Sequence, residues 1–74
     1  MIEKLREMQL QMIQMRMNLG VIIENSFGTL RNQYEDGDEE EAIDLTAETL
    51  INSIKRNNRL YHIICELDDI IEGR

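Results

Sequence analysis

Residues 5–22, LREMQLQMIQMRMNLGVI, decide the fold of this chain. Six apolar residues in this stretch follow one another at alternating steps of three and four, the spacing of a heptad seam on an α-helix. They are Leu5, Met8, Met12, Met15, Leu19 and Ile22. Successive helical residues advance by about 100°, which places a second apolar set roughly on the other side. This second set consists of Leu10, Ile13, Met17 and Val21. A helix with two apolar sides needs more than one neighbouring helix.

The length and cysteine content limit how this chain can be stabilised. At 74 residues, a single chain buries only about 60% of the surface that its unfolded state exposes. Its only cysteine, Cys65, excludes an intramolecular disulfide. There is no signal-peptide pattern and no apolar run near the ~20 residues of a membrane span. We therefore expect one helical domain over residues 1–74, in a soluble intracellular protein of the cytoplasm or the nucleus, stabilised by association.

The charge of the chain argues against two classes of partner. It carries 15 acidic and 8 basic side chains, a net charge of -7. Such a chain repels phosphate backbones and anionic lipid surfaces at long range. We therefore expect neither nucleic acid nor a membrane as the main partner.

The apolar period predicts an all-α fold, an antiparallel helical hairpin. After Ile22 or Ile23, the seam continues through Phe27, Leu30 and Tyr34. Without any proline, the first helix should cover residues 2–33 and the second residues 41–72. The acidic loop, residues 35–40, contains Gly37, which favours a turn. Asp38 is positioned as the N-cap of the second helix, with Glu41 three residues later as in a capping box.

Two features leave the number of helices open. Five polar residues in a row, 55–59, interrupt the apolar stripe of the second helix on every side. Either that helix continues through them, or it breaks near Asn57 and gives a three-helix bundle. In the first helix, Gly20 and Gly28 each cost about 1 kcal/mol relative to alanine, so they mark a kink, a break or the close approach of another helix.

The sequence assigns an inside and an outside to the hairpin, although the two roles are exchangeable. Gln9 and Arg16 belong to the polar residues that separate the two apolar sides of the first helix. We expect the partner-binding surface at Leu10, Ile13, Met17 and Val21. The expected interior consists of Leu5, Met12, Leu19, Ile54, Ile64 and Leu67.

The residues that carry catalytic or metal chemistry elsewhere are sparse in this chain. His62, Cys65, Glu66 and Asp69 share one side of the second helix, but the chain has no second histidine or cysteine to complete a metal site. The acidic loop does not have the glycine and glutamate spacing of a calcium loop. We expect no catalytic, metal or cofactor site, and no enzymatic activity of its own.

Residues 64–68, ICELD, follow an opening IEKLR at residues 2–6. This pairing resembles the small hairpin phosphatases of spore-forming bacteria, whose second helix carries a Ser-Gln-Glu-Leu-Asp motif. Glu66, Leu67 and Asp68 match that motif, and an isoleucine stands in the place of its serine. The resemblance implies a phosphatase that acts on response regulators.

The order of helix, acidic loop and second apolar helix over residues 47–71 is also similar to the small helical head subunits of the Mediator transcription complex, which pair with one another. This likeness implies a structural subunit, and neither resemblance assigns the chain to a family. Our leading expectation is a non-catalytic interaction module that forms a homodimer or completes a helical bundle with another protein. The alternative is a small regulator of an enzyme or phosphoprotein, acting through Glu66, Asp68 and Asp69.

Overall fold

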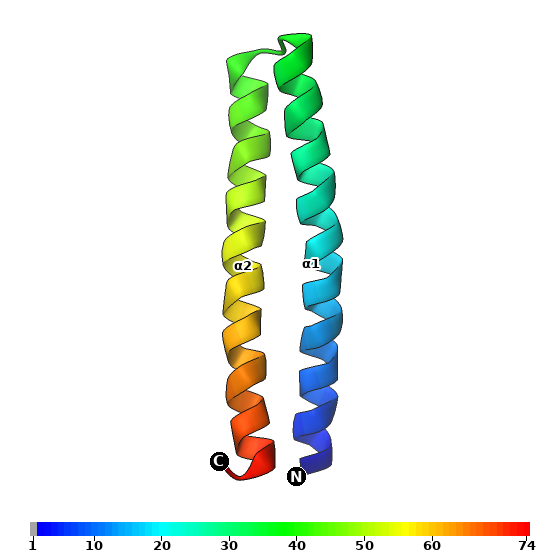
Figure 1. Cartoon of the computed structure of the whole chain (residues 1–74), viewed down its shortest axis with the longest axis vertical. Coiled ribbons are helices and arrows are strands. Elements are labelled where there is room, and N and C mark those ends of the chain that lie inside the picture. The colour runs from blue at the N-terminus through cyan, green and yellow to red at the C-terminus, as the bar shows by residue number, and fades with distance from the viewer. Residues whose placement is uncertain (1) are drawn as a thin grey trace.

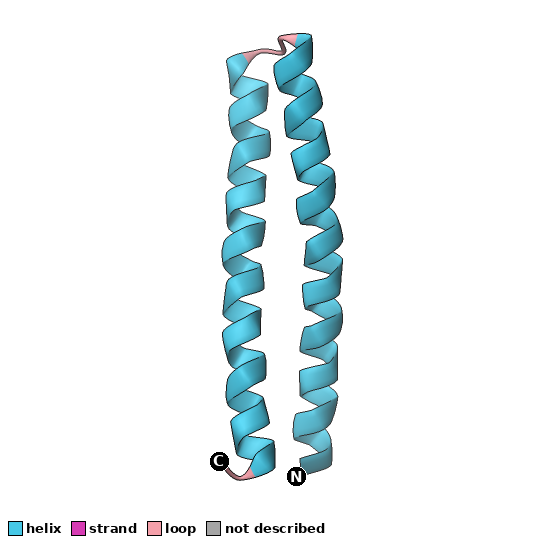
Figure 2. Ribbon diagram, viewed as in Figure 1, coloured by secondary structure: helices cyan, strands magenta, loops and turns pink. Residues whose placement is uncertain are grey.

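Two long helices packed side by side form the part of the molecule that the structure describes (Figure 1). The computed structural model describes residues 2–74, and in this range there are two helices and no strand (Figure 2). Helix α1 spans Ile2–Asp36 and α2 spans Glu40–Glu72. This confirms the all-α antiparallel hairpin. Helix α2 continues through Asn57 without a break, so the three-helix alternative is wrong.

The hairpin is elongated. It measures 53 × 15 × 13 Å, and its radius of gyration is 16.6 Å. A compact domain of this length has a radius of gyration of about 11 Å. Both termini lie at the end away from the connection (Figure 1). Each helix therefore contacts one neighbour only, and most of its circumference faces solvent.

Gly37 ends α1 and sets the turn between the helices. Its φ of 69° is a left-handed conformation that favours glycine. The Gly37 amide donates to the carbonyl of Tyr34 at 3.4 Å, and the Asp38 amide donates to that of Gln33 at 2.9 Å. This pair of bonds is a Schellman motif, which satisfies carbonyls at the helix end. Since residues 34–36 complete the last turn, α1 extends three residues beyond its expected end.

The N-terminus of α2 differs from the expected capping box. Glu39 precedes the first turn and makes no side-chain capping bond. Its carbonyl accepts the amides of Ala42 and Ile43 at 3.0 and 3.1 Å. The assignment of Asp38 as N-cap was wrong because Asp38 belongs to the motif that closes α1.

The interface between the helices follows a strict heptad on both sides. Every residue at these positions is buried or half-buried. In α1 the seam consists of Leu5, Gln9, Met12, Arg16, Leu19, Ile23, Ser26, Leu30 and Gln33. In α2 it consists of Ile43, Thr46, Leu50, Ser53, Asn57, Leu60, Ile64, Leu67 and Ile71. Polar residues take seven of these eighteen positions, so they interrupt the apolar seam on both helices.

The apolar core of this seam is small. Only four apolar side chains, all leucines, are buried among the described residues. They are Leu19, Leu50, Leu60 and Leu67. Of the expected interior, five residues lie in the seam. The sixth, Ile54, is 37% exposed because Ser53 and Asn57 face α1 instead.

Helix α1 is rotated from the expected orientation. Met8, Met15 and Ile22 lie outside the seam and are exposed. The residues that follow Met8 and Met15, Gln9 and Arg16, face α2, so their assignment as separating residues was wrong. Both have hydrogen-bond partners on α2, which makes their position in the seam tolerable.

Alanine at Gly20 or Gly28 should raise the free energy of unfolding by about 1 kcal/mol each, because α1 runs unbroken through both residues. A Cβ at either position would meet no atom within 4 Å, so the close approach of another helix, one of the alternatives for these glycines, does not occur within the described residues. Urea unfolding followed by circular dichroism measures the change. The control is Gly37→Ala, which should lower stability because alanine is strained at this positive φ. A loss of stability in Gly28→Ala would contradict the prediction.

Candidate functional site

One long side of the hairpin carries apolar residues directly beside the seam. In an antiparallel helix pair, the positions that flank the seam on one side of each helix come together. Here these positions recur every seven residues. They are Arg6, Ile13, Gly20, Phe27 and Tyr34 on α1, and Ala47, Ile54, Tyr61 and Asp68 on α2. We call this side the grooved face, because two hollows lie along it.

The first hollow lies near the connection between the helices and has a volume of about 540 Å³. Half-buried Leu30 and Ile43 lie in the seam, while Phe27 and Tyr34 are 49% and 78% exposed. Its lining residues are Phe27, Leu30, Arg31, Tyr34, Glu35, Ile43 and Ala47. The hollow is therefore mainly apolar, with one cation and one carboxylate in its lining.

The second hollow lies near the middle of the hairpin and has a volume of about 450 Å³. Arg16 Nε donates to Asn57 Oδ1 at 3.2 Å, across the seam. The guanidinium carbon lies 4.6 Å from the centre of the Tyr61 ring, in cation–π geometry. Ile13, Met17 and Ile64 complete the lining around this polar layer.

The four residues expected to bind a partner are all exposed, and their steps of three and four residues place them in one stripe along α1. Ile13 and Met17 line the second hollow. Leu10 and Val21 neighbour them on the edge of this stripe that lies away from the seam. The apolar stripe of the sequence includes Phe27 and Tyr34, so they were expected in the seam, whereas the structure places them on the surface. Phe27 and Tyr34 lie 14 and 21 residues after Ile13, which are multiples of the heptad, and this spacing was the available signal.

The acidic residues of the regulator alternative take part in local contacts at the end that holds the termini. Asp68 Oδ1 accepts a hydrogen bond from Gln9 Nε2 at 2.9 Å, and the same Nε2 lies 3.3 Å from the Ile64 carbonyl. Asp69 pairs with Arg74 at 3.8 Å, with both side chains exposed. Glu66 is exposed.

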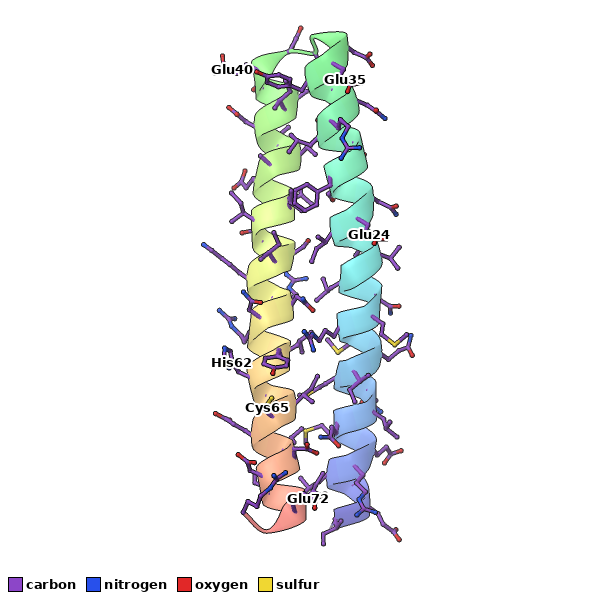
Figure 3. The ribbon with its side chains drawn as sticks, viewed as in Figure 1. Glu24, Glu35, Glu40, His62, Cys65 and Glu72 are labelled. Atoms are coloured by element: carbon purple, nitrogen blue, oxygen red, sulfur yellow. The ribbon has the colours of Figure 1, made fainter. Side chains whose placement is uncertain are left out.

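His62 lies on the outer side of α2, and Cys65 is an exposed free thiol (Figure 3). Within residues 2–74, no group of three or more histidine, cysteine, aspartate or glutamate side chains is arranged to hold a metal ion. Neither described helix combines the length and apolar character that crossing a membrane requires.

No family model matches this chain, and no curated protein or solved structure is significantly similar to it.

Replacing the polar layer of the second hollow tests its role in the seam. The double variant Arg16→Leu with Asn57→Leu should raise the free energy of unfolding by about 1 kcal/mol, because it removes both partners of one hydrogen bond and joins the apolar layers. The measurement is urea unfolding at low protein concentration. Asn57→Leu alone is the control. Its free energy of unfolding should rise less than that of the double variant, because Arg16 then lacks its hydrogen-bond acceptor. Destabilisation by the double variant would contradict the prediction.

Proposed function

We propose that this chain is a non-catalytic protein–protein interaction module. It completes a helical bundle by packing its grooved face against helices of another chain, either a second copy or a different protein. Among the residues lining the hollows there is no nucleophile with an adjacent base, which fits a role in binding rather than catalysis.

The observation that carries this proposal is the surface that the chain exposes alone. Its accessible surface is 5987 Å². A compact monomer of this size exposes about 4,700 Å². The excess of about 1,300 Å² is larger than the area that each partner buries in a standard interface, about 800 Å². One standard interface on the hairpin would remove about 800 Å² of this excess, which is more than half of it.

The composition of the exposed surface supports the same proposal. Four buried leucines give a hairpin of marginal stability, because ordering the backbone costs about 1–2 kcal/mol per residue. Large apolar side chains meanwhile remain exposed along the grooved face, among them Phe27, Tyr34 and Tyr61. Soluble monomers rarely expose contiguous apolar patches beyond a few hundred Å². Packing further helices against this face would bury these rings and supply the missing core.

The proposal is tested by self-association at high concentration, which reports on the exposed face whichever partner occupies it. In about 0.5 M salt, which screens the net charge, helicity and molar mass should rise with protein concentration. The double variant Leu10→Asp with Met17→Asp should abolish the rise, because each change places a charge beside the second hollow. Circular dichroism and light scattering measure the two quantities.

The matched control is Gln11→Asp with Asn18→Asp, which adds the same charge at the same spacing on a polar side of α1. This variant should associate like the unmodified chain. A cooperatively folded monomer at every concentration would exclude a second copy as the partner, and such a monomer that also binds no amphipathic helical peptide would contradict the proposed function. Equal loss of association in both double variants would assign the effect to charge alone.

A further inference from the structure

We propose that the hollow near the connection binds a basic amphipathic helix of another protein. This inference rests on the proposed function and names the chemistry of the partner. The occupant would place apolar side chains between Phe27 and Tyr34 and carry lysine or arginine on its flanks. The proposal depends on the apolar lining of the hollow and on the charge around it.

The shape of the hollow fits a helix. Phe27 and Tyr34 are two helical turns apart, about 10 Å along α1. Their exposed rings stand above half-buried Leu30 and Ile43, with Ala47 providing a small side chain on α2. An amphipathic helix presents apolar residues at i, i+3 or i+4, and i+7, over the same length. A segment of three to four turns therefore spans this hollow.

The net charge of the molecule is concentrated around this hollow. Residues 31–48 contain eight acidic side chains and one basic side chain, Arg31, so this segment has a net charge of -7. The other residues contain seven acidic and seven basic side chains and are neutral in sum. Glu35 lines the hollow, and Asp44 and Glu48 directly follow its lining residues Ile43 and Ala47. A basic partner would be steered to this end and bound there.

A second copy fits this end less well. In a parallel pair of hairpins, two segments of charge -7 would lie at the same end. In an antiparallel pair, each would lie beside the end that holds the termini, where residues 2–9 and 64–74 contain six acidic and three basic side chains. Neither arrangement brings a net positive charge to the hollow. Charge complementarity therefore favours a foreign basic helix.

The experiment measures peptide binding to the full chain. The probe is a fluorescent peptide of about 18 residues, with leucines at helical spacing on one side and lysines on the other. Its counterpart has glutamate in place of every lysine. Fluorescence anisotropy in about 0.02 M and about 0.3 M salt gives both affinities. We expect the lysine peptide to bind at least tenfold more tightly than its counterpart at low salt, and more weakly at high salt.

Apolar variants test whether the peptide occupies the hollow. Phe27→Ala with Tyr34→Ala should weaken binding of the lysine peptide about tenfold or more, because it removes both exposed rings. Both changes favour the helix, so the fold should persist by circular dichroism. The matched control is Met15→Ala with Ile22→Ala, outside the grooved face, which should change the affinity less than about twofold.

Charge variants test the source of the attraction. Neutralising Glu35, Asp44 and Glu48 to their amides should weaken binding about tenfold at low salt. The control neutralises Glu66, Asp69 and Glu72 in the same way, about 30 Å or more from Asp44 along α2, and should have little effect. Arg31→Gln removes the one cation of the hollow and should strengthen binding about two- to threefold.

Three results would overturn the inference. Equal affinity for the two peptides would show that charge does not determine binding. An equal loss of affinity in the two neutralised variants would assign the attraction to the net charge of the chain and not to the acids beside the hollow. Full binding by Phe27→Ala with Tyr34→Ala would place the peptide elsewhere. If one of these results is found but the chain still self-associates with rising concentration, the proposed function is retained and only the basic-helix inference is refuted. A stable monomer that binds neither peptide would refute both the inference and the proposed function.

Discussion

The whole molecule depends on a seam between two helices in which polar residues interrupt the apolar layers. The buried leucines sit between layers such as Arg16 with Asn57, where a hydrogen bond crosses the seam. Polar layers reduce the apolar area that folding buries, but they favour one register because their groups pair only in that register. Two helices also cannot surround a core. The seam therefore specifies the hairpin well and stabilises it weakly.

The positions beside the seam reverse the usual pattern of a two-stranded coiled coil. Such positions normally carry charged residues, which form ion pairs across the edges of the seam. Here they carry Ile13, Phe27 and Tyr34 on one helix and Ile54 and Tyr61 on the other. Charge lies mostly at the two ends and on the outer sides. Further helices can pack onto a hairpin whose flank is apolar. Such packing would add the buried apolar area that the partly polar seam does not provide.

The sequence predicted the helices, their antiparallel order and the turn at Gly37, because these follow from local periodicity and glycine conformation. It did not predict the rotation of α1 by about 50° about its axis. Leu5, Met12 and Leu19 belong to both possible seams, and hydrophobicity favoured Met8 and Met15 over Gln9 and Arg16. Which of the two seams α1 uses depends on α2. Groups of α2 more than 40 residues away in the sequence accept hydrogen bonds from the side chains of Gln9 and Arg16. The grooved face was missed for the same reason, since Phe27 and Tyr34 were counted in the seam.

The acidic end combines two opposite electrostatic effects. Glu40 and Glu41 lie in the first turn of α2, where negative charge interacts favourably with the helix dipole. Glu35 and Asp36 lie in the last turn of α1, which has no basic residue, so their interaction with its dipole is unfavourable. The acids on α2 therefore have a structural explanation, and those on α1 have none within the chain. A cationic helix seated beside Glu35 would offset both this unfavourable interaction and the repulsion among the neighbouring carboxylates.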